Sequence, residues 1–211
     1  MKKIVCFGDS LTEGWIDAGS AFHPYTQKLQ SLLSQNSNAN VINAGISGET
    51  ICVDMMKRLP GVMHQDGSVD ILIIQGGTND ILQKPELEHS IDLYEKFKEL
   101  ISIAVDKGVS KILVLTTMEG FFVESDEASM SQEISDKLRR DFNTKMTNNV
   151  TSLSTNTTEI CLCDLSSKLP MFSLDEKDVK LYWDDYLHPS PLGYDKMGEI
   201  VYEELKSLSW I

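Results

Sequence analysis

Ser10 and His188 are the two residues whose surroundings best suit them to nucleophilic catalysis. A serine hydroxyl is a weak nucleophile until a neighbouring imidazole takes its proton. Ser10 follows a short apolar run and the pair Gly8-Asp9, a place where a strand gives way to a turn and can present a hydroxyl. Asp185 precedes His188 by three residues, so one tight turn would bring its carboxylate to the imidazole Nδ1–H while Nε2 faces the serine. These residue types and spacings predict a Ser–His–Asp arrangement for acyl transfer.

Three groups could stabilise the oxyanion that forms when a serine attacks a carbonyl. Such stabilisation needs hydrogen-bond donors aimed at the developing negative charge. The predicted donors are the backbone N–H groups of Ser10 and Gly48 and the side-chain amide of Asn79. Glycine at position 48 also lets the main chain approach a substrate closely. The structural alternatives are a tight turn at Gly48 and a loop role for Asn79, bonded to its own backbone.

Two further assignments stay open on the sequence alone. Ser10 could be a turn or helix N-cap serine, a common role for a serine after a strand. The carboxylate partner of His188 could be Asp184 or Asp185, and the three-residue spacing favours Asp185. Asp9 is expected to form the turn rather than to take part in catalysis.

Short β-branched runs alternate with longer amphipathic stretches along the chain. The runs are mostly apolar on both faces, which is typical of parallel strands covered by helices on both sides. The predicted strands span residues 3–7, 40–43, 70–75, 111–116 and 159–164. The predicted helices lie near residues 25–34, 51–58, 86–106, 129–150 and 191–208. This alternation predicts an α/β fold, a three-layer α/β/α sandwich around a five-stranded parallel sheet, in a single domain over residues 1–211.

Polar clusters follow three of the predicted strands, and a fourth cluster precedes the last helix. They are residues 8–11, 43–48, 76–80 and 185–189. In open parallel α/β sheets, ligands bind beyond the carboxyl ends of the strands. The sequence therefore predicts that all four clusters meet at one edge of the sheet. The residues brought together would be Ser10, Gly48, Asn79, Asp185 and His188.

Charge and composition disfavour several classes of partner. A formal net charge of -13 argues against nucleic-acid binding, which needs clustered Lys and Arg, and against recruitment to anionic membranes. The apolar run near the N-terminus is too short for a signal-peptide core, and no stretch approaches the ~20 apolar residues of a membrane span. The four cysteines lie in or beside apolar runs. We expect reduced thiols, a cytoplasmic location and no metal site.

The four clusters resemble, in order, the sequence blocks of the GDSL, or SGNH, hydrolases of esterase and lipase type. Gly-Asp-Ser-Leu at residues 8–11 is similar to the first block and Asn-Ala-Gly-Ile-Ser-Gly at 43–48 to the second. Gly-Thr-Asn-Asp at 77–80 is similar to the third block and Asp-Tyr-Leu-His at 185–188 to the last. The resemblance spans nearly the whole chain and implies a flavodoxin-like fold. It also implies that Ser10 is the nucleophile, that Gly48 and Asn79 are oxyanion-hole donors, and that Asp185 and His188 complete the triad.

The resemblance implies a serine hydrolase that cleaves carboxylic esters of small or medium acyl chains through an acyl-enzyme, without a metal or organic cofactor. Intracellular isoamyl-acetate-hydrolase-like esterases look most similar, because of the compact length and the Tyr-Trp-Asp-Asp approach to the histidine at 182–185. The alternatives are a lysophospholipase or acyl-thioesterase, a carbohydrate O-acetylesterase, and a non-catalytic flavodoxin-like module that binds an anionic cofactor. The four clusters contain no Lys or Arg, which argues against the binding module.

Apolar and aromatic side chains near the predicted site are candidates for the wall of a substrate pocket. Exposed aromatic residues at a ligand-binding rim commonly mark an interaction site. The candidates are Trp15, Met118, Phe121, Phe122, Trp183, Tyr186 and Leu187. Such a wall favours a small-molecule ester with an apolar acyl group over a sugar ester.

Overall fold

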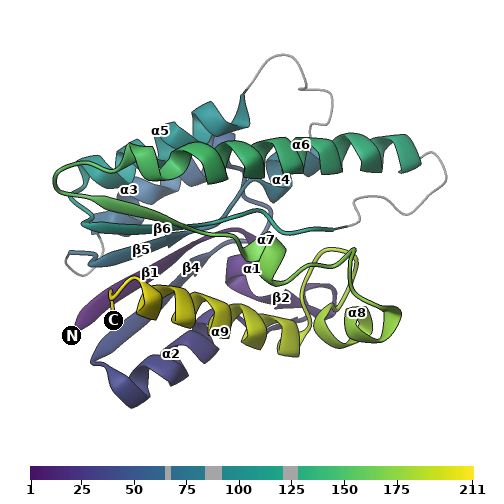
Figure 1. Cartoon of the computed structure of the whole chain (residues 1–211), viewed down its shortest axis with the longest axis horizontal. Coiled ribbons are helices and arrows are strands. Elements are labelled where there is room, and N and C mark those ends of the chain that lie inside the picture. The colour runs from purple at the N-terminus through teal and green to yellow at the C-terminus, as the bar shows by residue number, and fades with distance from the viewer. Residues whose placement is uncertain (65–67, 84–91, 121–127) are drawn as a thin grey trace.

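A five-stranded parallel sheet forms the centre of the computed structural model, which describes residues 1–64, 68–83, 92–120 and 128–211. The strand order is β4-β1-β5-β6-β7, and helices cover both faces (Figure 1). The strands are β1 (Lys2–Gly8), β4 (Ala39–Gly45), β5 (Ile71–Ile74), β6 (Lys111–Leu115) and β7 (Glu159–Cys163). This order is that of flavodoxin-like sheets, so the predicted α/β/α sandwich is confirmed.

Each face of the sheet has its own apolar core, because successive side chains of a strand point to opposite faces. On β1, Ile4 and Cys6 belong to the core on one face, and Val5 and Phe7 belong to the core on the other. In Figure 1, α2 and α9 cover the first face, and α3, α5 and α6 cover the second. These helices are α2 (Tyr25–Asn36), α3 (Met56–His64), α5 (Leu93–Asp106), α6 (Ala128–Asn149) and α9 (Pro191–Ser207).

Two helices differ from their predicted bounds for local reasons. The Asp92 carboxylate accepts the N–H of Tyr94 at 3.0 Å and caps α5, which therefore begins at Leu93 rather than near residue 86. Part of the predicted start, residues 86–91, lies outside the described residues. The helix predicted near 51–58 opens as a π-helical turn and continues as α3 to His64 through Pro60, although proline usually ends a helix.

Several short elements escaped prediction. They are α1 (Ser10–Glu13), the antiparallel hairpin of β2 (Trp15–Ile16) and β3 (Ala21–Phe22), α4 (Thr78–Gln83), α7 (Leu165–Lys168) and α8 (Glu176–Tyr182). In Figure 1, α1, β2, α7 and α8 gather at the end of the sheet opposite the two chain termini. No helix within the described residues is both long and apolar enough to cross a lipid bilayer.

Candidate active site

Ser10 is the first residue of α1, directly beyond the interior strand β1. Asp9 caps this short helix, because its carboxylate accepts the N–H of Leu11 at 3.0 Å. The turn is tight: a Cβ at Gly8 would lie 2.7 Å from the carbonyl oxygen of Gln75 on the next strand. The N-cap role considered for Ser10 therefore belongs to Asp9, and the serine side chain is left for other contacts.

A closed loop between α8 and α9 carries Asp185 and His188. Its two ends are joined by an antiparallel bridge between Trp183 and Pro189. Inside the loop, one carboxylate oxygen of Asp185 accepts the N–H groups of Leu187 at 2.7 Å and of His188 at 2.6 Å. These bonds close residues 185–188 into a turn, and the turn brings the Asp185 carboxylate next to the His188 imidazole.

The loop brings His188 to Ser10 across 178 positions of sequence. The imidazole Nε2 lies 3.1 Å from the Ser10 hydroxyl, and Nδ1 lies 2.9 Å from the second carboxylate oxygen of Asp185. Partial burial acts to raise the pKa of Asp185, but the hydrogen bonds from His188 and from the Leu187 N–H outweigh it and hold that pKa below its usual value. An ionised carboxylate, an imidazole and a hydroxyl are thus aligned in one relay.

Gly48 lies in the loop that follows β4, and Asn79 lies in the first turn of α4, which follows β5; β4 and β5 are the two strands on either side of β1. Gly48 has a φ of 82°, a left-handed conformation that favours glycine. The Asn79 amide donates one hydrogen bond to the Glu49 carbonyl at 2.9 Å, which ties the two segments together. That amide carries a second N–H that could serve a substrate.

The sequence profile of the GDSL-like lipase/acylhydrolase family matches residues 6–196. The chain belongs to this family. Membership confirms the resemblance seen in the four sequence blocks and places the chain among ester-cleaving hydrolases. No curated protein sequence matches the chain. The more specific likeness to isoamyl-acetate hydrolases stays a prediction.

Solved structures of GDSL-type and other esterases share the fold. A carbohydrate acetylesterase from Sinorhizobium meliloti is 17% identical with a TM-score of 0.71, covering 99% of this chain and 100% of its own. A lipase/acylhydrolase from Enterococcus faecalis is 22% identical with a TM-score of 0.65, covering 98% and 96%. An acetyl xylan esterase from Geobacillus stearothermophilus is 22% identical with a TM-score of 0.65, covering 97% and 94%. At these identities the likeness shows the fold of this GDSL family member.

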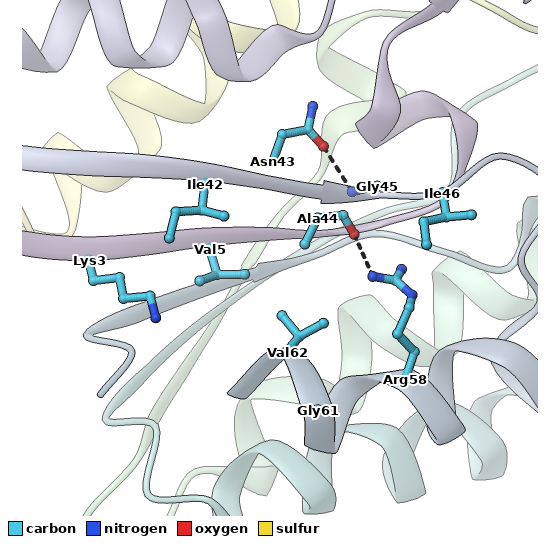
Figure 2. A pocket seen from close by; sticks show the side chains of 10 residues that line it. All are labelled: Lys3, Val5, Ile42, Asn43, Ala44, Gly45, Ile46, Arg58, Gly61 and Val62. Atoms are coloured by element: carbon cyan, nitrogen blue, oxygen red, sulfur yellow. Dashed lines mark hydrogen bonds between the residues drawn. The ribbon is translucent and has the colours of Figure 1, made fainter. Parts of the chain in front are cut away.

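Arg58 braces the loops around the site from α3. Its guanidinium donates to the Glu49 carboxylate at 2.7 Å, to the Ala44 carbonyl at 3.0 Å and to the Gly8 carbonyl at 3.2 Å. Figure 2 shows the bond to Ala44, at the end of β4. Both charged side chains are largely buried, so the pair is held in a fixed geometry. In this GDSL chain, Arg58 therefore links the ends of β1 and β4 to the Gly48 loop.

A cavity of about 380 Å³ lies beside Arg58, between β1, β4 and α3 (Figure 2). Its described lining is about equally polar and apolar and includes none of the predicted catalytic or oxyanion residues. Within the described part of the chain, no group of three or more His, Cys, Asp or Glu side chains is arranged to hold a metal ion.

The predicted pocket residues occupy different depths. The centroid of the Trp15 ring lies 4.3 Å from that of the His188 ring. Tyr186, two residues before His188, is 62% exposed. Leu187 packs against Gly120, where a Cβ would lie 2.7 Å from the leucine Cδ1. Of these three, Trp15 contacts the relay directly, and the pocket role of Tyr186 and Leu187 stays a prediction.

The other predicted pocket residues are buried or undescribed. Met118 and Trp183 lie in the core on the α2 and α9 face of the sheet, with 1% and 5% exposure. Phe121 and Phe122 lie outside the described residues.

Sequence reasoning missed two supports of the site. It did not foresee that the carboxylate of Asp184, an exposed residue, accepts the N–H of Asp17 at 2.8 Å. It also passed over the Arg58–Glu49 pair, whose signal is an arginine among apolar residues on a helix that faces the sheet. Asp80 anchors the same region: its carboxylate accepts the N–H groups of Ile51 and Cys52, where the π-helical turn begins.

Proposed function

We propose that this chain is a serine hydrolase that cleaves carboxylic esters through an acyl-enzyme. The observation that carries the proposal is the relay from Asp185 through His188 to Ser10, with hydrogen-bonding distances of 2.9 Å and 3.1 Å. Hydroxyl, imidazole and carboxylate in this order are the parts of a nucleophilic triad. Membership of the GDSL-like lipase/acylhydrolase family supports the same reaction class.

The proposed reaction begins when His188 Nε2 takes the proton of the Ser10 hydroxyl. The serine oxygen attacks the ester carbonyl and forms a tetrahedral oxyanion. His188 then gives its proton to the departing alkoxide, so the alcohol leaves and the acyl group stays on Ser10. A water molecule, deprotonated by His188, repeats the attack and releases the acid. Asp185 holds the ring orientation and stabilises the imidazolium at each stage.

The proposed oxyanion hole consists of the N–H groups of Ser10 and Gly48 and the side-chain amide of Asn79. Support comes from the strand order, which places the three segments beyond adjacent strands. The bond from Asn79 to the Glu49 carbonyl fixes the amide next to the Gly48 loop. Donors held in advance stabilise the developing charge without reorganisation.

The proposed substrates are esters with a small or medium acyl chain, bounded by Trp15, Tyr186 and Leu187. A carbohydrate O-acetylester is the second candidate, because solved structures with this fold include a carbohydrate acetylesterase and an acetyl xylan esterase. Relative turnover of p-nitrophenyl acetate, butyrate and octanoate, with acetylated xylan beside them, separates these substrates. Preference for octanoate would instead favour a lysophospholipase or acyl-thioesterase.

The central test measures kcat on p-nitrophenyl acetate for Ser10→Ala and His188→Ala. Each change should lower kcat on the order of a thousandfold or more, because the members of a triad act as a unit. Asn79→Ala should lower kcat by about a hundredfold with little change in KM. Ser207→Ala and His64→Ala, at exposed positions on α9 and α3, are matched controls and should keep the wild-type rate.

Labelling with a fluorophosphonate probe decides between an enzyme and a binding module. The wild-type chain should carry the adduct on Ser10, and Ser10→Ala should carry none. Hydrolysis that survives in Ser10→Ala, or an adduct on another serine, would overturn the proposed function.

A further inference from the structure

The β2–β3 hairpin beside the relay is built on a strained turn. Its strands pair Trp15 with Phe22, and Ile16 with Ala21. The residues between them include Asp17 and Ala18 with φ values of 50° and 51°, followed by Gly19 at 82°. A left-handed conformation costs a non-glycine residue roughly 1–2 kcal/mol. Strain of this kind persists only where the surroundings hold the backbone in place.

Two hydrogen bonds from the C-terminal part of the chain hold this turn. The Asp184 carboxylate accepts the N–H of the strained residue Asp17 at 2.8 Å. The Tyr194 hydroxyl, on α9, donates to the Trp15 carbonyl at 3.1 Å. Asp184 belongs to the loop of the relay, and its own N–H donates to the His188 carbonyl at 2.9 Å. The hairpin and the histidine loop are therefore fastened to each other.

The fastened hairpin places the Trp15 indole against the His188 imidazole. The ring centroids are 4.3 Å apart and the ring planes are tilted by 43°. The turn backbone supports the indole from another side, since a Cβ at Gly19 would lie 2.5 Å from the indole Nε1. At its Nδ1 edge the ring is held by Asp185, whose carboxylate lies on an exposed loop.

We propose that the hairpin of residues 15–22 is a clamp on His188, with Trp15 and Asp184 as positioning residues. The inference rests on the serine-hydrolase function proposed above. The indole blocks rotation and tilting of the imidazole, so Nε2 stays directed at Ser10. Its π face also favours the imidazolium that forms after proton transfer. Asp184 acts one step away, because its bond to Asp17 keeps the strained turn, and with it Trp15, in place.

The test compares variants that release the clamp with conservative variants that keep it. Trp15→Leu and Asp184→Ala should each lower kcat on p-nitrophenyl acetate by about tenfold or more, because small misplacements of a base are costly. For Asp184→Ala, KM should change by less than about twofold, because Asp184 acts on His188 through the turn and not on the substrate. Trp15→Leu also removes part of the proposed pocket wall, so its fall in kcat should come with a higher KM. Trp15→Phe keeps an aromatic face, and Asp184→Asn keeps an acceptor oxygen, so both should recover most of the rate.

Controls separate this inference from the proposed function. Asp106→Ala, at an exposed aspartate on α5, should leave kcat unchanged. Gly19→Ala pushes on the indole without touching the relay and should lower kcat as Trp15→Leu does, which keeps the test open if that variant fails to fold. Wild-type kcat in Asp184→Ala and Gly19→Ala, or a raised KM with unchanged kcat in Trp15→Leu, would overturn the clamp. Loss of activity in Ser10→Ala alongside those results would leave the serine-hydrolase function intact.

Discussion

Asp9 is a fully buried carboxyl group one residue before the candidate nucleophile. One of its oxygens accepts the Leu11 N–H, and the other has no hydrogen-bond partner among the described residues. Burial raises the pKa of Asp9 to about 7, against the opposing effects of the Leu11 bond and of nearby His188. The folded chain therefore keeps a proton on Asp9 at pH values where an unfolded chain has released it.

This proton retention makes stability depend on pH in a defined direction. The contribution of Asp9 to the free energy of unfolding is full below about pH 4 and is lost as the pH rises to about 7. Asp9→Asn keeps the acceptor oxygen for Leu11 but cannot ionise. Between about pH 4 and about pH 8, the wild-type chain should lose up to about 4 kcal/mol relative to this variant. Urea unfolding at several pH values measures the difference, with Asp106→Asn as the exposed control, and parallel curves would contradict the buried acid.

Among the elements, the long ones followed from the sequence and the short ones did not. Periodicity predicts strands that are apolar on both faces and helices with an apolar stripe. The polar clusters after β1, β4 and β5 follow neighbouring strands, and Ser10 contacts His188. The β2–β3 hairpin has strands of only two residues, too short for any period. Its turn holds Asp17 and Ala18 in a left-handed conformation, which neither residue type predicts. The sequence could not predict the proposed clamp, because the hairpin is held by contacts with residues far away in the sequence.

In the candidate site too, a contact set by local spacing was predicted, and supporting contacts between distant residues were not. The pairing of Asp185 with His188 followed from local spacing, because a three-residue turn is a short-range matter. The contacts of Asp184 with Asp17 and of Arg58 with Gly8 join segments far apart in the sequence, and no local pattern encodes them. The sequence spacing thus predicted the reactive groups, whereas the contacts that hold them in place depend on tertiary packing.

Gln30 on α2 protects the exposed edge of the sheet at β4. Its side-chain amide donates to the Ala39 carbonyl at 3.1 Å and accepts the Val41 N–H at 2.8 Å, as a neighbouring strand would. An uncovered strand edge invites pairing with another chain. Within the described sheet, β4 is such an edge strand. Gln30 therefore satisfies backbone groups that would otherwise be open to association.

Gln30→Leu should remove both bonds while keeping the helix. We expect the free energy of unfolding to fall by about 1–2 kcal/mol, because two backbone groups lose their partner. We also expect self-association that grows with protein concentration. Chemical unfolding and sedimentation velocity over a range of concentrations measure these effects. Gln27→Leu, an exposed glutamine on the same helix, is the matched control; equal behaviour of the two variants would count against edge protection.

At the scale of the whole molecule, the sheet separates two apolar cores. The core on the α2 and α9 face contains Cys6 from the interior strand β1 and Cys163 from the edge strand β7. Both thiols are fully buried, and burial raises the pKa of each to about 12. Cys52 and Cys161 are only partly buried, and none of the four cysteines forms a disulfide. The reactivity of the two buried thiols therefore measures whether this core opens at the interior strand β1 and at the edge strand β7.

Thiol modification should distinguish these two classes at mildly alkaline pH. The thiolate is the reactive form, and a group that is both buried and protonated offers neither access nor thiolate. In the folded chain, Ellman's reagent should modify Cys52 and Cys161 first, whereas Cys6 and Cys163 should react only at the rate of global unfolding. In concentrated guanidinium, all four cysteines should react promptly. Mass spectrometry of the labelled peptides assigns each site. Rapid labelling of Cys163 with continued protection of Cys6 would mean that β7 opens by itself, and that the two strands do not share one cooperative core.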